Sequence, residues 1–356
     1  MSEWKTYRLG EICKNVCSGG TPKSTEPSYY GGNIPWLNTK EVNFCRIDKT
    51  EKTITDSGFQ NSSTKWVEKN SVIMAMYGAT AAKVAVNMIP LTTNQACCNL
   101  TIDPNLADFR FVYFYLCYKY TSLAALANGG AQQNLNAQRI KDFDITLPPL
   151  EEQKHIADIL WSLDDKIELN RRINANLEAQ AQALFRSWFV DFEPFRDGPF
   201  VDSELGKIPQ GWKVGNYTDI VEIKGGGTPK TGIQEYWNGT IPFFSPKDVG
   251  ASCFVLDTEK HITAKGLENC NSSLFQPNTV FITARGTVGK VVMTGTEMAM
   301  NQTNYALLGK QNISQYYVYH ITRQLVARLL KKANGAVFNA ITTRDFTSEQ
   351  IVIPPF

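Results

Sequence analysis

One stretch of sequence occurs twice in the chain, and this repeat constrains the fold more than any other feature. The stretch GTPKSTEPSYYGGNIPWLNTKEV, Gly20 to Val42, returns 207 positions later as GTPKTGIQEYWNGTIPFFSPKDV, Gly227 to Val249, with ten of 23 positions identical. Shorter matches follow in the same order, namely TEKTIT at Thr50 and TEKHIT at Thr258, Asn94-Gln95 and Asn301-Gln302, and the Pro pairs Pro148-Pro149 and Pro354-Pro355. The repeat predicts two modules with the same fold.

The segment between the copies, Glu151 to Val190, has the pattern of one long helix. It contains no Gly or Pro, and residues on one face recur every three or four positions, at Ile156, Leu160, Leu163, Ile167, Asn170, Asn174, Leu177, Ala181, Leu184 and Trp188. This is coiled-coil spacing, and about 40 helical residues extend about 60 Å. The helix is therefore expected to act as a rigid spacer. Asn170 and Asn174 either fix the register against a partner helix or lie beside the seam in solvent.

The two modules share a pattern of short strands and one helical stretch. Strand-like runs include Ser71 to Met76 and Lys83 to Val86 in the first module, and Thr279 to Thr283 and Lys290 to Met293 in the second. Helical periodicity covers 109–126 and 314–332. The predicted fold class is α+β, with two mainly-β domains joined by a long coiled-coil-type helix. The predicted bounds are 1–150 for the first domain, 151–190 for the helix, 191–208 for an extended linker and 209–356 for the second domain.

Composition places the chain among globular proteins and limits its partners. The hydrophobic fraction is 43%, and 36 Lys and Arg nearly balance 34 Asp and Glu, so any nucleic-acid surface must be local. The eight Cys contain no CxxC pair, which favours reduced thiols, and the three His offer no metal-ligand spacing. The sequence has no apolar signal segment and no run of about 18 apolar residues. We expect a soluble, cytoplasmic protein without a metal site.

The sequence contains no recognisable catalytic motif. The segment Arg285-Gly-Thr-Val-Gly-Lys-Val has the wrong spacing for a phosphate-binding loop. Both Pro pairs follow an apolar residue, Leu147 or Ile353, where a DNA amino-methyltransferase needs Asn or Asp. The adjacent acids Asp164 and Asp165 diverge on a helix and indicate a solvated face. The sequence therefore favours a binding function over an enzyme.

Side chains suited to reading DNA gather in the repeated loops. Lys and Arg bind phosphates or guanines, and Asn and Gln can contact adenine with two hydrogen bonds. The candidates in the first module are Thr21, Lys23, Asn38, Lys40, Tyr77, Lys83, Asn94, Gln95, Gln132 and Gln133. Those in the second are Thr228, Lys230, Ser245, Lys247, Arg285, Lys290, Asn301, Gln302, Asn334 and Asn339.

These loops carry different side chains on the same framework, for example Tyr77 against Arg285 and Gln133 against Asn339. Such differences are expected of two modules that read different sequences. GGTPK is also typical of a turn, because Gly allows a positive φ and Pro fixes the φ of the next turn residue. Any single candidate can therefore be a turn residue instead of a DNA contact.

The predicted helix ends in an aromatic cluster, LFRSWFVDFEPF. The cluster is richer in aromatic residues than one helix can bury alone. It is either a packed junction or a docking patch for a partner, with Leu184, Phe185, Trp188 and Phe189 as the candidate docking residues.

These features together resemble the DNA specificity subunit of type I restriction-modification systems. The resemblance is carried by GGTPK, by IPW or IPF followed by Lys and an acid, by RGT with GK, by PPLEEQKHIADILWSLDDKIELNRR and by LFRSWF, and it covers nearly the whole chain. It implies two target recognition domains, 1–150 and about 209–356, each reading half of a bipartite site in double-stranded DNA. The helix 151–190 would separate them and dock methyltransferase subunits. Rigidly spaced domains require half-sites at a fixed separation and helical phase.

The resemblance also implies that the chemistry belongs to partners. Methyltransferase subunits would bring S-adenosylmethionine, and restriction subunits would use ATP and Mg²⁺, so no cofactor is expected in this chain. The alternative left open by the residues is a structural or protein-interaction adaptor with two modules and no DNA recognition.

The sequence departs from the family pattern at its end. The family carries a second helix after the second domain, antiparallel to the first, whereas this sequence ends at Pro354-Pro355-Phe356. The seam of 151–190 would then lack its partner within the chain. We expect weak self-association through this helix, or poor solubility, when the chain is alone.

Overall fold

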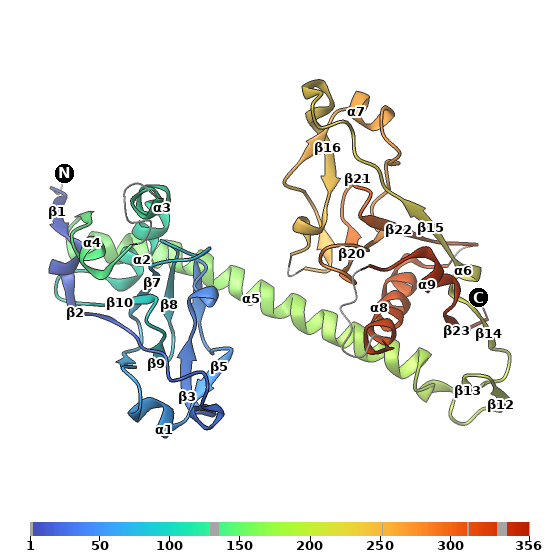
Figure 1. Ribbon diagram of the computed structural model, residues 1–356, viewed down its shortest axis with the longest axis horizontal. Helices are drawn as coiled ribbons and strands as arrows, with labels where there is room; N and C mark the ends of the chain where they lie inside the picture. Colours follow the sequence, from blue (N-terminus) through green and yellow to red (C-terminus); the bar gives the residue numbers. More distant parts are fainter. Residues whose placement is uncertain (1–2, 129–134, 251, 312, 333–339, 356) are drawn as a thin grey trace. The chain divides into compact units, whose positions relative to one another are not determined.

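The repeat in the sequence corresponds to a repeat in the fold. A computed structural model (Figure 1) describes all residues except 1–2, 129–134, 251, 312, 333–339 and 356. The chain forms two units, residues 1–169 and 170–356. Among the described residues, each unit contains a five-stranded sheet, a smaller second sheet and a two-stranded pair. The α+β architecture with two mainly-β domains is confirmed.

The first unit contains two sheets and a terminal pair. The five-stranded sheet has the order β2 (Cys13–Ser18), β10 (Cys97–Ile102), β7 (Val72–Ala75), β8 (Val84–Asn87) and β4 (Cys45–Ile47). The second sheet has the order β5 (Lys52–Ile54), β3 (Tyr30–Leu37), β9 (Leu91–Thr93) and β6 (Trp66–Val67). The antiparallel pair joins β1 (Lys5–Arg8) to β11 (Asp144–Leu147).

The second unit repeats the plan of the first. Its five-stranded sheet has the order β15 (Val221–Gly225), β22 (Asn304–Gly309), β19 (Val280–Thr283), β20 (Val291–Thr294) and β17 (Phe254–Val255). The second sheet has the order β18 (His261–Ile262), β16 (Trp237–Phe244) and β21 (Ala299–Met300). The terminal pair joins β14 (Lys213–Asn216) to β23 (Gln350–Ile353).

The central strand of each large sheet is buried on both faces. In β7, Val72 and Met74 point into a core shared with helices, while Ile73 and Ala75 point into a core between the two sheets. Successive residues of a strand face opposite sides, so an uninterrupted apolar run fits a strand covered on both faces. The strand β19 repeats this arrangement in the second unit, with Phe281 facing the core between the sheets.

Helices cover one face of each large sheet. The predicted helix 109–126 is two helices, α2 (Phe109–Tyr118) and α3 (Tyr120–Asn128), because Lys119 adopts a non-helical conformation between them. In the second unit α8 (Gln315–Lys332) matches the predicted range 314–332. Short helices α1 (Asp56–Gln60) and α7 (Ala264–Glu268) begin at equivalent caps, and α4 (Ala137–Lys141), α6 (Tyr217–Ile220) and α9 (Thr343–Thr347) complete the units.

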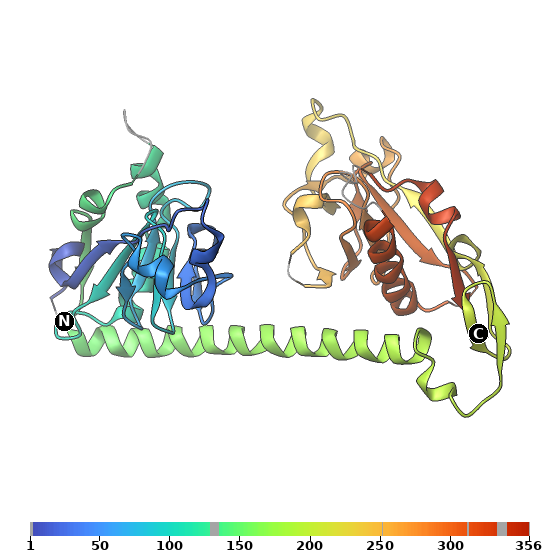
Figure 2. The ribbon, with the colours of Figure 1, turned by 60° about the horizontal axis from the view of Figure 1, so that its bottom comes forward.

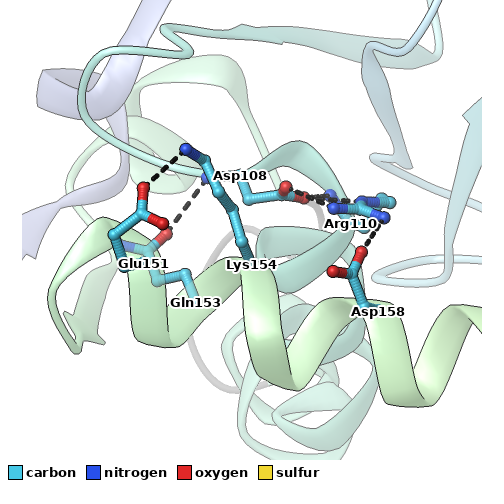
Figure 3. Close-up of polar contacts among 6 residues, drawn as sticks. All are labelled: Asp108, Arg110, Glu151, Gln153, Lys154 and Asp158. Atoms are coloured by element: carbon cyan, nitrogen blue, oxygen red, sulfur yellow. Dashed lines mark hydrogen bonds and ion pairs between the residues drawn. The ribbon is translucent and has the colours of Figure 1, made fainter.

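The long helix α5 (Leu150–Phe189) lies within one residue of its predicted bounds and is continuous (Figure 2). Its first turns pack within the first unit (Figure 3). Gln153 is buried, and its side chain accepts from the Asp108 backbone N–H at 3.1 Å and donates to the Pro148 carbonyl at 2.9 Å. Arg110 pairs with Asp108 at 2.8 Å and with Asp158 of α5 at 2.6 Å.

Two further contacts fix α5, one within each unit. In the first unit the Arg46 guanidinium lies 3.6 Å from the Trp161 ring centroid and pairs with Asp164 at 2.7 Å and with Asp165. In the second unit Glu178 pairs with Arg323 of α8. Each end of α5 is therefore part of a unit, and residues 169–177 between them are exposed.

The apolar seam predicted for this helix is exposed from Leu160 onward. The side chains of Leu163, Ile167 and Leu177 are all about half exposed or more. The buried positions of α5 form another stripe, which includes Ala157 and Phe185. The helix thus presents an apolar face that neither unit covers.

The segment predicted as an extended linker, 191–208, contains a hairpin. The strand β12 (Phe200–Ser203) pairs antiparallel with β13 (Gly206–Pro209), with Ser203 opposite Gly206. Gly206 has a φ of +96°, a conformation that favours glycine in such a turn. The prediction that this segment is an extended linker was wrong, because two four-residue strands carry too few residues to show a clear alternation in the sequence.

Candidate nucleic-acid interface

The two GTPK loops are held by the same hydrogen bond in both units. The Thr21 hydroxyl donates to the Gln95 side-chain oxygen, and the Thr228 hydroxyl donates to that of Gln302. The preceding glycines allow close backbone contact, since a Cβ on Gly20 or Gly227 would collide with a backbone nitrogen. All four polar side chains remain exposed. The structure therefore brings these predicted site residues together.

The asparagines before these glutamines organise their own turns. Asn94 is buried, and its side-chain oxygen accepts from the Ala96 backbone N–H at 3.2 Å. Asn301 is half-buried and accepts from the Thr303 backbone N–H at 3.0 Å and from the Thr303 hydroxyl at 2.7 Å. The geometry gives both residues a structural role beside the exposed Gln95 and Gln302.

Asn38 and Ser245 cap short 3-10 helices after β3 and β16. The side-chain oxygen of Asn38 accepts from the Lys40 backbone N–H at 3.2 Å, and the Ser245 hydroxyl donates to Asp248 at 2.8 Å. A carboxylate repeats in both loops, since Glu41 accepts from the Asn38 and Glu51 backbones and Asp248 from those of Ser245 and Glu259. This repeated acid explains why KEV and KDV recur in the sequence.

The predicted lysines differ in their partners. Lys40 pairs with Glu51, whose hydrogen bond raises the pKa of the Lys40 ammonium. Lys83 donates to the Asn43 side chain at 2.8 Å. Lys23, Lys230 and Lys247 have exposed side chains. Lys290 lines a different pocket from Arg285, together with Glu178 and Arg323.

A pocket in the second unit gathers five of the predicted residues. It has a volume of about 440 Å³ and is lined by Thr228, Ser245, Lys247, Arg285 and Asn301. Other lining residues, among them Thr231, Trp237 and Lys260, were not predicted from the sequence. Lys260 belongs to the repeated TEK segment, so the repeat itself was a signal for it.

The charge of this pocket is positive. Lys247, Lys260 and Arg285 line it with one acid, Glu259. Neutral donors and acceptors on Thr228, Ser245 and Asn301 lie between these cations. This arrangement suits a ligand that combines negative charge with hydrogen-bonding edges, as the backbone and base edges of DNA do.

Only part of the predicted docking patch is accessible. Phe185 is 7% exposed and stacks on His320 at 5.2 Å between ring centroids, and Phe189 packs against Trp212. Leu184 is 57% exposed and Trp188 is 45% exposed. The cluster is thus a packed junction that leaves Leu184, Trp188 and Val190 on its surface. The candidates Gln132, Gln133, Asn334 and Asn339 lie outside the described residues.

The described residues contain neither a metal-binding cluster nor a membrane-spanning helix. No group of three or more His, Cys, Asp or Glu side chains there could hold a metal ion. No helix in the same part of the chain is long and apolar enough to cross a membrane.

Comparison with known proteins identifies a family and relatives that span nearly the whole chain. A family profile described as the type I restriction modification DNA specificity domain matches residues 1–179 and 209–356. The chain is similar to the type I restriction enzyme MjaIX specificity subunit of Methanocaldococcus jannaschii, with 27% identity covering 99% of this chain and 83% of that subunit. It is also similar to the HindI specificity subunit of Haemophilus influenzae, with 22% identity covering 99% of this chain and 90% of that subunit.

A solved structure has the same fold. The S subunit of a type I restriction-modification system from M. genitalium aligns with a TM-score of 0.56 and 16% identity, covering 99% of this chain and 85% of that one. At this identity the likeness shows the fold alone.

Proposed function

The chain belongs to the family of type I restriction modification DNA specificity domains, and we propose that it binds a bipartite DNA sequence as the specificity subunit of a type I restriction-modification complex. Its role is recognition, and catalysis belongs to its partner subunits. The two relatives that the chain covers over 83% and 90% of their own length are both specificity subunits. Nothing in the relatives or the fold favours the adaptor alternative.

The DNA-binding proposal rests mainly on one observation: the same group of polar loop residues occurs in both units. Each unit presents an exposed Thr and Gln joined by a hydrogen bond, next to lysines at equivalent positions. Lys23, Lys40 and Lys52 correspond to Lys230, Lys247 and Lys260. Contacts to phosphates carry no sequence information, so both units can use the same cations for them. The side chains that differ between the units are then free to select bases.

We further infer that the partners dock on the exposed face of α5. Its apolar side chains, including Leu184 and Trp188, remain uncovered by either unit. Methyltransferase subunits would supply S-adenosylmethionine, and restriction subunits would use ATP and Mg²⁺. Such a complex acts on DNA in the cytoplasm.

The test is DNA binding by the chain assembled with its methyltransferase subunit, measured over a range of salt concentrations. Each neutralised phosphate releases counterions, so log K should fall with log salt by about 0.9 per phosphate contacted. Lys230→Ala and Lys23→Ala should each lower the slope, while Lys154→Ala, away from these loops on the first turn of α5, should not. If the complex does not bind DNA, or if DNA binding depends neither on salt nor on either lysine, the adaptor alternative is favoured.

A further inference from the structure

Tyr77 in the first unit and Arg285 in the second lie on equivalent turns. The following glycine, Gly78 or Gly286, has a φ of +81° in both. The preceding residue donates its backbone N–H to the equivalent carbonyl in each case, Met76 to Ala96 at 2.8 Å and Ala284 to Thr303 at 2.9 Å. One backbone frame therefore holds two different side chains at one position.

Those two side chains are engaged differently. The Tyr77 hydroxyl donates to the Gln95 backbone carbonyl at 3.2 Å, and the ring is half-buried. Arg285 is exposed, and no ion pair or side-chain hydrogen bond involves it within the described part of the chain. The residues outside that part include no Asp or Glu, so no acidic side chain there could pair with it. The guanidinium thus keeps its donors available for a ligand.

The structural arginines of both units contrast with this one. Arg46, Arg110 and Arg323 each pair with a carboxylate and fix α5 or α2. Arg285 performs no such task, because it lies on a turn tip beside the pocket formed with Thr228, Ser245 and Lys247. Its removal therefore leaves the packing of the unit intact.

Residues that are the same in both units can be distinguished from those that differ, and this distinction separates expected phosphate contacts from expected base contacts. Three lysine positions of these loops are the same in both units, Lys23, Lys40 and Lys52 matching Lys230, Lys247 and Lys260, as expected for contacts that do not depend on sequence. The residue at the turn tip differs between the units, Tyr77 against Arg285, as expected for a contact that depends on the DNA sequence. A guanidinium with free donors matches the O6 and N7 acceptors of guanine in the major groove with two parallel hydrogen bonds, and this is the commonest specific contact of arginine with DNA.

We propose that Arg285 is a specificity-determining residue that selects a guanine in the half-site read by the second unit. The inference rests on the proposed DNA recognition. In the first unit Tyr77 occupies the equivalent place and has no guanidinium. The base at the corresponding position of the other half-site is therefore selected by different contacts.

The experiment is selection of bound DNA from a random library by the chain assembled with its methyltransferase subunit. The Arg285→Ala variant should lose one guanine preference in one half-site and keep every other position, including the whole of the other half-site. Its affinity for the selected sequence should fall about tenfold to a hundredfold, with little change on unrelated DNA. The Tyr77→Arg variant should gain a guanine preference at the equivalent position of the other half-site.

Lys230→Ala is the matched control in the same unit. As a phosphate contact it should weaken binding to all sequences equally and lower the salt slope by about 0.9. If Arg285→Ala behaves like Lys230→Ala, or keeps the guanine preference, the inference is overturned while DNA recognition stands. If the unaltered complex selects no bipartite sequence, the proposed function fails and the inference fails with it. Unfolding temperatures of the variants equal to that of the unaltered chain exclude misfolding as the cause.

Discussion

Among single residues, Gln153 makes several buried polar contacts at the start of α5 (Figure 3). It is 1% exposed. Its amide nitrogen donates to the Pro148 and Leu106 carbonyls at 2.9 and 3.4 Å, and its oxygen accepts from the Asp108 backbone at 3.1 Å. The glutamine of PPLEEQ therefore joins the end of β11, the loop before α2 and the first turn of α5.

We expect Gln153→Ala to destabilise the first unit by about 2 to 3 kcal/mol, because it leaves buried backbone groups without partners. The measurement is the opening free energy of β7 amides by hydrogen exchange. Lys154→Ala is the control, since its pair with Glu151 at 2.7 Å is largely exposed and should contribute less than about 1 kcal/mol. Equal losses in the two variants would contradict this account of Gln153.

The buried thiols of the first unit make its stability depend on pH. Burial raises the pKa values of Cys13, Cys98 and Cys117 to about 12. An unfolded thiol ionises near about 8.5. Between those values the unfolded chain loses protons that the folded chain keeps, so the free energy of unfolding should fall as pH rises from about 8.5 towards 12.

The check is the opening free energy of β7 amides, corrected for the intrinsic exchange rate, at pH 7.5 and pH 9.5. It should be lower at pH 9.5. In Cys98→Ala the decline should be shallower by up to about 1.4 kcal/mol per pH unit, because one titrating group is removed. Parallel declines in the two proteins would show that Cys98 does not titrate on unfolding.

The sequence identified the repeated side chains but not all of their roles. Thr21 and Gln95 were singled out as polar loop residues, and the structure places both on the surface. Asn94 looked equally suitable, yet its side-chain oxygen is used within its own turn. The difference arises from loop conformation, because a backbone N–H two residues away becomes an Asn partner only after the turn closes.

Among the elements, α5 was predicted almost to the residue, and the seam expected to lack a partner within the chain is exposed from Leu160 onward. The absence of Gly and Pro defined the length of the helix. The spacing of Leu163, Ile167 and Leu177 could not tell whether a partner covers them, since that depends on other chain segments. The hairpin β12–β13 was missed because two four-residue strands carry too few residues for a clear alternation.

We predict that the exposed stripe of α5 causes self-association. The variant with Leu163→Gln, Ile167→Gln and Leu177→Gln should sediment as a monomer at concentrations where the unaltered chain forms larger species. Burial of apolar area drives such association, and these side chains are among the exposed large hydrophobic residues described. A control with Lys166→Gln and Gln180→Ala, two exposed polar positions of the same helix, should associate like the unaltered chain. A monomeric unaltered chain at every concentration would contradict the prediction.

For the whole molecule, the chain joins two units of one topology, each with its own core. The five-stranded sheets have equivalent strand orders, and the sheet cores of the first unit have counterparts in the second. This order of module, helix and module could be predicted, because a repeat and a change of period are both visible in the sequence. The two loop sets share their lysines and differ at positions such as 77 and 285. The account therefore predicts two half-sites of different sequence.

The most direct test of this central claim is to map methylation of random-sequence DNA by the chain assembled with its methyltransferase subunit and labelled S-adenosylmethionine. The account predicts one split motif, made of two different half-sites with a gap of fixed length and no sequence preference. Methylation at a single continuous motif, at two identical half-sites, or without any motif would contradict it.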